Sequence, residues 1–193
     1  MGNYNITKLN QCLIENDVDE NIRQKIMGSL ENVRITDKPE ITAGAFFNAM
    51  TAMDELLDED TKKNIREGCA CSLGGKNRKM WKEINKNFTT PQERIKAMND
   101  TQPGGGIFRI TGKGKYEVTF FDELSPYYKR CVCLGGRLHS INKKWSKTWC
   151  YCCGGQIKYV LETVLGKKVK VKILSTALTS MGKKSCRFEL KEI

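Results

Sequence analysis

Apolar residues in the first hundred positions recur every three or four residues, the spacing that places them on one face of a helix. The first clear stripe comprises Val18, Ile22, Ile26, Leu30 and Val33. Asp17 and Glu20 stand at its start with the spacing of a capping box, so we expect the helix to begin there. A second stripe predicts a helix over about residues 40–57. It comprises Phe46, Ala49, Met50, Met53 and Leu57.

Three more helices are expected before residue 101. One runs from near Glu59 towards Glu67, and the next follows a Gly-Gly pair and carries an apolar stripe. That stripe comprises Met80, Trp81, Ile84 and Phe88. Thr90 and Pro91, with Glu93 beyond them, form a start signal in which Thr90 is the N-cap and Pro91 the first helical residue. Residues 1–100 are therefore predicted to be the helical part of the chain.

The second half adds strands to the pattern. Ile107–Thr111 and Tyr116–Phe121 are predicted strands joined by a glycine-rich hairpin. An amphipathic helix over residues 156–165 should end at Gly166, whose position suits a C-terminal cap. The apolar residues then alternate with charged ones in two further strands, comprising Val169, Val171 and Ile173, and Cys186, Phe188 and Leu190. This order predicts one α+β domain over residues 1–193, with N-terminal helices followed by a mainly antiparallel sheet packed with helices.

Charge divides the chain at the same place. Residues 1–100 carry 15 Lys and Arg against 16 Asp and Glu, whereas residues 101–193 carry 18 against 6, a net charge of +12. The basic part also holds six of the nine cysteines. Positive surroundings lower the pKa of thiols and favour thiolates, which bind metals and attack electrophiles.

We expect a cytoplasmic protein. The opening MGNYNITKLNQ lacks the features of a signal peptide, and Ile6 stands where a myristoylation signal requires Ser or Thr. No apolar run approaches the ~18 residues that span a membrane. In a reducing compartment, clustered cysteines bind metal or react more often than they form disulfides, and nine cysteines cannot all pair within one chain.

Seven of the cysteines fall into three short clusters of one form: Cys-x-Cys followed closely by Gly-Gly. They are Cys69, Cys71, Cys131, Cys133, Cys150, Cys152 and Cys153. Metal-bound thiolates accept backbone N–H groups, and glycine lets the chain approach them without a Cβ clash. We therefore expect at least four of these thiols to bind a metal. Cys12 and Cys186 lie on apolar stripes and are expected in the core.

Two alternatives to a metal site stay open, reactive or redox thiols and small buried hydrophobic residues. Zinc is the preferred metal because it forms closed four-cysteine sites, and an iron–sulfur cluster is the alternative.

The spacing between the second and third clusters restricts how they can meet. Leu138, Ile141, Trp145 and Trp149 stand at helical spacing between them. A straight helix across this interval would separate Cys133 from Cys150 by about 25 Å. A shared metal therefore requires Gly135 and Gly136 to fold the chain back, or requires Cys69 and Cys71 to complete one site.

His139, Trp145 and Trp149 are the candidate residues for binding a small molecule. His139 is the only histidine, so a Cys–His catalytic pair would have to use it, although a solvated or structural role is commoner. Lysines interleave with the two tryptophans as in sites for single-stranded nucleic acid. Their four-residue spacing fits a buried helix face better, so nucleic acid is not the favoured partner.

The C-terminal part, residues 150–193, resembles 4-vinyl reductase domains. The shared features are a helix ending in Leu165-Gly166, the strand that follows, and a closing Gly-x-x-x-Cys-x-Phe strand from Gly182 to Phe188. The whole chain looks like a cysteine-rich bacterial relative of these domains. The resemblance implies an α+β domain that binds small, often hydrophobic ligands, with zinc in some members. Those members have an acid and a cysteine where this chain has Ser175 and Leu178. A small hydrolase family acting on aminothiazoline carboxylate has a similar ending.

The leading hypothesis is a cytosolic, cysteine-ligated metal-binding domain that senses or carries a small molecule. The alternative is a small thiol-dependent hydrolase or redox enzyme that uses one of the clustered cysteines. The expected partners are a small-molecule ligand and no membrane, and the sequence is compatible with a homodimer.

Overall fold

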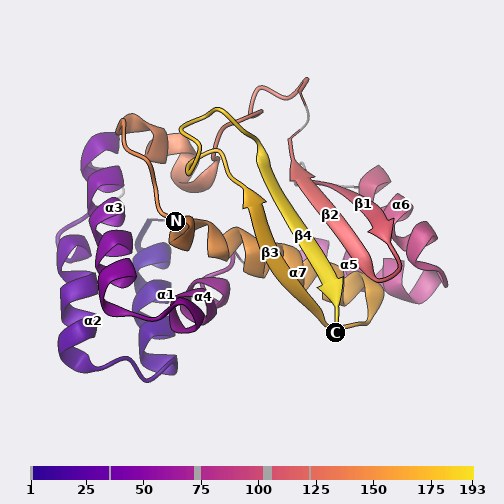
Figure 1. Ribbon diagram of the computed structural model, residues 1–193, viewed down its shortest axis with the longest axis horizontal. Coiled ribbons are helices and arrows are strands. Elements are labelled where there is room, and N and C mark those ends of the chain that lie inside the picture. Colours follow the sequence, from indigo (N-terminus) through magenta and orange to yellow (C-terminus); the bar gives the residue numbers. More distant parts are fainter. Residues whose placement is uncertain (1, 35, 72–74, 102–105, 122) are drawn as a thin grey trace.

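The computed structural model describes the whole chain except residues 1, 35, 72–74, 102–105 and 122 (Figure 1). Before the sheet lie α1 (Gly2–Glu15), α2 (Glu20–Met27), η1 (Gly28–Leu30), α3 (Pro39–Leu56), α4 (Glu59–Gly68), α5 (Gly75–Asn87) and α6 (Pro91–Thr101). The second half contains β1 (Gly106–Gly112), β2 (Lys115–Phe120), η2 (Cys133–Ser140), η3 (Lys147–Cys150), α7 (Tyr151–Leu165), β3 (Val169–Ser175) and β4 (Cys186–Glu192). This confirms the predicted α+β class.

The four strands form one antiparallel sheet in the order β1-β2-β4-β3. Val118, Phe188 and Ile173 are register partners across three strands, which aligns their apolar side chains in one row. This face packs against α5, α6 and α7 (Figure 1). Charged side chains, including Lys170 and Lys191, occupy the exposed face.

The buried side chains form two hydrophobic clusters. The helical cluster joins α1 to α4 with the segment from η2 to the start of α7, and it includes Phe46, Ile65 and both Trp145 and Trp149. The sheet cluster joins the apolar sheet face to α5, α6 and the rest of α7. Cys153 packs against both clusters, so α7 begins at the boundary between them. Figure 1 shows α7 extending from the N-terminal helices to beneath the sheet.

A glycine allows the start of α7 to lie close to α4. A Cβ atom at Gly155 would lie 2.7 Å from the Cα of Glu67 and closer still to its carbonyl oxygen. No side chain fits there, so Gly155 permits the close helix contact. Gly154 and Gly155 are both helical, and the expected role of these glycines beside metal-bound thiolates stays a prediction.

Several helix boundaries differ from the predictions. Asp19, not Asp17, caps α2, because its carboxylate accepts the N–H groups of Asn21 and Ile22. Asp17 instead takes a left-handed conformation, with φ of 53°, that ends the preceding turn. The helix then stops at Met27, so Val33 lies outside it. The expected capping box at Thr90 and Glu93 is confirmed by hydrogen bonds in both directions. Helix α1 was not predicted at all.

The expected helix carrying Trp145 and Trp149 does not form. Leu134, Gly135 and Gly136 have φ values of 52°, 65° and 82°, which turn the chain sharply inside η2. The backbone is extended at Ile141, and a short turn, η3, leads into α7. This is the fold-back at Gly135-Gly136 that a shared site requires. Among the described residues, no helix is both long and apolar enough to cross a membrane.

Candidate metal centre

Three of the predicted thiols meet at the start of α7. The sulfurs of Cys133, Cys152 and Cys153 all lie within 4.8 Å of one another. Cys133 begins η2, and the other two belong to the first turn of α7. Four sulfurs around one zinc ion at about 2.3 Å stand roughly 3.8 Å apart, so these three sulfurs are near enough to one another to bind a single ion.

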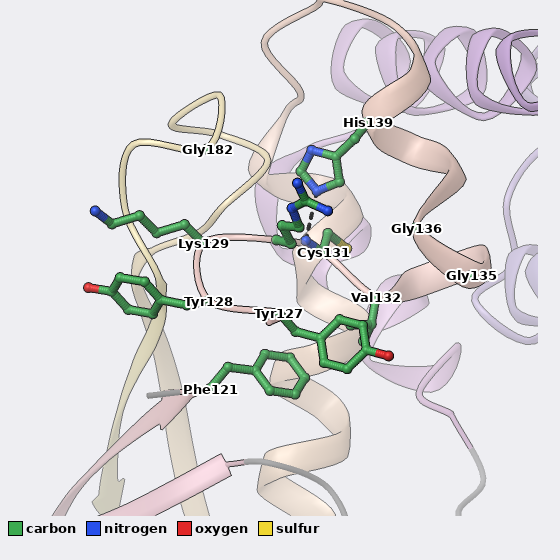
Figure 2. A pocket seen from close by; sticks show the side chains of 11 residues that line it. Phe121, Tyr127, Tyr128, Lys129, Cys131, Val132, Gly135, Gly136, His139 and Gly182 are labelled. Carbon is green, nitrogen blue, oxygen red and sulfur yellow. Dashed lines mark hydrogen bonds between the residues drawn. The ribbon is translucent and has the colours of Figure 1, made fainter. Parts of the chain in front are cut away.

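Cys131 lies beside this group, but its sulfur is not within 4.8 Å of all three of the others. The neighbouring Cys133 is the largest cause of its raised pKa. The backbone N–H of Cys131 donates to Nε2 of His139 at 2.7 Å (Figure 2). The histidine therefore holds the backbone of a cluster cysteine in place. We call Cys131, Cys133, Cys152 and Cys153 the thiol cluster.

The thiol cluster favours one thiolate and resists a second. The pKa of Cys133 lies well below the usual thiol range, chiefly because Cys131, and then Cys152 and Cys153, donate hydrogen bonds to its sulfur. The pKa values of Cys131, Cys152 and Cys153 are raised well above the usual thiol value, and the contact with Cys133 is the largest cause for each of them. Like charges at this separation repel strongly, whereas a bound cation would remove that repulsion and allow every sulfur to ionise.

A buried arginine lies beside the thiol cluster. Arg66 of α4 is 4% exposed, and its guanidinium donates to the carbonyl oxygens of Thr148 and Trp149 at 3.4 and 3.1 Å. It also lies 4.7 Å from the ring centre of Trp149. Burial opposes its charge, but the neighbouring sulfurs, Cys152 first, raise its pKa. No ion pair joins Arg66 to a carboxylate among the described residues, so the neighbouring cysteine sulfurs are the groups that raise its pKa.

Trp149 brings a buried indole to this part of the molecule. Its Nε1 has no hydrogen-bond partner within normal distance among the described residues. The indole is a minor cause of the lowered pKa of Cys133. Donors directed at sulfur stabilise thiolates and orient metal ligands.

The other predicted cysteines lie apart from the thiol cluster. Cys150 is buried and donates to Oγ1 of Thr176 at 3.3 Å, and burial raises its pKa to about 12. Cys69 is hydrogen-bonded to Cys12, whose pKa burial also raises to about 12. Cys71 is exposed, and its Gly-Gly partner falls partly on residues outside the described chain. All nine cysteines are free thiols.

The three residues expected to bind a small molecule lie in different surroundings. Trp145 and Trp149 are 2% and 3% exposed, with ring centres 5.6 Å apart, and both pack in the helical cluster. Trp145 also borders a pocket of about 180 Å³. His139 borders that pocket and a much larger open cavity of about 1130 Å³, which Cys131 also lines (Figure 2). Burial and the nearby Arg130 lower the pKa of His139.

Arg66 was not anticipated from the sequence, although a signal was present. Lys62, Ile65, Arg66 and Cys69 recur at helical spacing on the buried side of α4. A cation on an apolar stripe that ends at a cysteine indicates a buried charge in need of a partner.

Fold and thiol cluster together define a cysteine-rich α+β protein with a candidate site for one metal ion. The sequence matches the model of a family described as Family of unknown function (DUF6144), over residues 5–192. The chain belongs to this family. The comparison with curated proteins finds no match. The resemblance of residues 150–193 to 4-vinyl reductase domains stays a prediction.

Proposed function

We propose that this chain is a cytosolic metal-binding domain in which the thiol cluster holds one zinc ion and a small molecule binds beside it. The observation that carries the proposal is the mutual approach of three sulfurs within 4.8 Å, with Cys131 two residues before one of them along the chain. Zinc takes four thiolates in tetrahedral sites, and all four residues of the thiol cluster can supply one.

Charge balance supports the same assignment. Four thiolates around Zn²⁺ carry a net charge of about −2, and burying such a charge is costly without a nearby cation. Arg66 is buried against these sulfurs and forms no carboxylate ion pair within the described chain. The negative charge of the metal-bound thiolates and the positive charge of Arg66 would therefore partly neutralise each other. Neutral thiols would leave the charge of the buried arginine without a counterpart.

The compactness of the thiol cluster favours a single ion over an iron–sulfur cluster. A cubane distributes its cysteines over several irons, so their sulfurs stand farther apart than the ligands of one ion. Sulfurs that are all within 4.8 Å of one another suit mononuclear coordination.

The alternative, a thiol-dependent hydrolase or redox enzyme, receives less support from the geometry. A Cys–His pair needs a ring nitrogen of the histidine within reach of a sulfur. His139 uses Nε2 to accept the backbone N–H of Cys131, which leaves the proton on Nδ1. The only histidine thus orients a backbone segment.

Metal content in matched variants tests the proposal. Protein purified anaerobically without chelator should contain about one zinc per chain. Cys133→Ser and Cys152→Ser should each lose most of it, because serine is a poor ligand for a soft metal site. Cys150→Ser is the matched control: it lies two residues from Cys152, is equally buried, and faces Thr176 instead.

Equal metal content in all three variants, or wild-type protein with less than about a tenth of an equivalent of metal, would contradict the proposal. A brown preparation with visible absorption and bound iron would replace zinc by the iron–sulfur alternative.

A further inference from the structure

The large cavity beside Cys131 is the strongest unassigned feature of the molecule. Its volume is about 1130 Å³, and its wall runs from Phe121 through residues 127–132 to the turn at Gly135-Gly136 and to Gly182 (Figure 2). Ligand cavities of small molecules reach about 300–1,000 Å³, so this one is large enough for a drug-sized compound.

The cavity presents aromatic surface next to positive charge. The rings of Phe121 and Tyr127 are 5.5 Å apart, and Figure 2 shows these two side chains together on one side of the cavity. Tyr127 is 52% exposed although it is a large aromatic residue. Lys129 and Arg130 also line the wall, and neither forms an ion pair with any described residue. No described lining residue is acidic.

The wall is built from unusual backbone conformations. Phe121 and Lys129 both line the cavity with φ of 57°, and a bulky residue at positive φ is an outlier. Leu134 and Met181, also at positive φ, each precede a glycine of the wall. Four of the five non-glycine residues with positive φ in the described chain therefore cluster here. Such strain gathers at binding sites, where a surface must keep one shape.

From these features we infer that the cavity binds an organic anion with a flat aromatic body, such as an aromatic carboxylate, sulfonate or phosphate ester. The ring lies against Phe121 and Tyr127, and the acidic group meets Arg130. An arginine in this position forms paired hydrogen bonds with an acid group.

The inference deepens the proposed function and rests on it in one respect. Cys131 lies in the cavity wall and also belongs to the thiol cluster. A ligand in the cavity therefore touches a residue that would hold the metal, so its arrival changes the surroundings of the ion. This contact gives the site a means to report occupancy.

Two fluorescent probes that differ by one charge test the inference. Anilinonaphthalene sulfonate is an aromatic anion, and phenylnaphthylamine has the same rings without the sulfonate. We expect one sulfonate per folded, metal-loaded chain, bound at least about tenfold more tightly than the neutral probe. Arg130→Gln should weaken the sulfonate about tenfold and leave the neutral probe within about twofold.

Arg109→Gln is the matched control, because Arg109 is an exposed arginine on β1 outside the cavity. It should change neither affinity. Tyr127→Ala should weaken both probes, since the ring contacts the shared aromatic body. Both arginines are exposed, so the variants are expected to fold, which a thermal melt verifies.

Equal affinity for the two probes, or sulfonate binding unaffected by Arg130→Gln, would overturn the inference. Loading the protein with cobalt in place of zinc distinguishes a failure of the cavity inference from a failure of the metal proposal. Selective sulfonate binding to a chain that takes up no cobalt supports the cavity and contradicts the metal centre. A cobalt spectrum unchanged by bound sulfonate contradicts the contact through Cys131.

Discussion

The two hydrophobic clusters of this protein are completed in different ways. The core of the sheet cluster consists mainly of aliphatic and aromatic side chains, and Phe188, Val118 and Leu161 are fully buried in it. The helical cluster surrounds sulfur, and the buried Lys62 and Arg66 lie at its edge. Buried polar atoms without a partner among the described residues belong to α3, η2, the segment leading into α7, and Gln156. The sheet cluster contains no buried charged side chain among the described residues, whereas Lys62 and Arg66 are buried charges in the helical part.

The largest expected effect separates these two regions directly. Removing the metal should lower the melting temperature by roughly 10 °C or more, because metal binding energy appears as folding energy when the unfolded chain has no site. Hydrogen exchange should increase first in α1 to α4 and around η2, while the amides of β2 and β4 stay protected. Uniform loss of protection across both regions would show that the clusters do not differ in their need for metal.

Arg66 should be the most sensitive single residue that is not a cysteine. Arg66→Met removes the cation beside the thiol cluster, and we expect it to cost about 3 kcal/mol in the metal-loaded protein. Arg187→Met is the control on the sheet side, where a partly exposed pair with Glu117 contributes less than about 1 kcal/mol. Denaturant melts measure both, and equal costs for the two variants would refute a charge role for Arg66.

Adjacent glycines in α7 offer a matched pair. Gly155→Ala should destabilise by about 2 kcal/mol, since its methyl group collides with the α4 backbone at Glu67. Gly154→Ala places its methyl 3.5 Å from Val171, an ordinary contact, and should be neutral or stabilising by up to about 1 kcal/mol. Chemical denaturation of the two variants checks this, and the account of helix contact fails if Gly155→Ala is as stable as wild type.

The smallest effect concerns acid stability at the junction of α4 and α7. Hydrogen bonds from Lys147, and then from Tyr151, lower the pKa of Glu59 from 4.5 to about 2. A lowered folded pKa stabilises the protein above pH 4.5, and this contribution disappears as the pH falls towards 2. Because Glu59 is 49% exposed, solvent screening limits the effect to about 1 kcal/mol.

Glu59→Gln should therefore melt at a lower temperature than wild type near neutral pH, and the difference should shrink as the pH approaches 2. A constant difference across this range would assign the effect to packing.

Most of the fold could be predicted because the relevant signals are local. Apolar periodicity located α3, α5, α7 and the four strands, and the start signal at Thr90 and Pro91 located α6. Helix α1 was missed although Ile6, Leu9 and Leu13 stand at helical spacing in it. The buried Leu9 and Leu13 pack in the helical cluster with α4 and neighbouring helices. Trp145 and Trp149 are both buried, and their four-residue spacing is also that of a buried helix face. The left-handed conformation at Gly135 turns the chain, so no continuous helix forms across this segment.

The thiol cluster could be predicted only in part. The sequence selected the seven clustered cysteines, yet which of them meet depends on where α7 begins. Because Tyr151 is its first residue, Cys152 and Cys153 face Cys133, while Cys150 faces Thr176. Arg66 reaches the cluster through contacts with Trp149, 83 positions away in the chain, and such distant contacts leave no spacing to read.

X-ray absorption at the zinc edge of the metal-loaded protein tests the central claim most directly. Four sulfur ligands at about 2.3 Å are the predicted result, and the sulfur count should drop in Cys131→Ser if that residue supplies the fourth. A first shell dominated by nitrogen and oxygen at about 2.0–2.1 Å would contradict the account, because it would place the metal away from the thiol cluster.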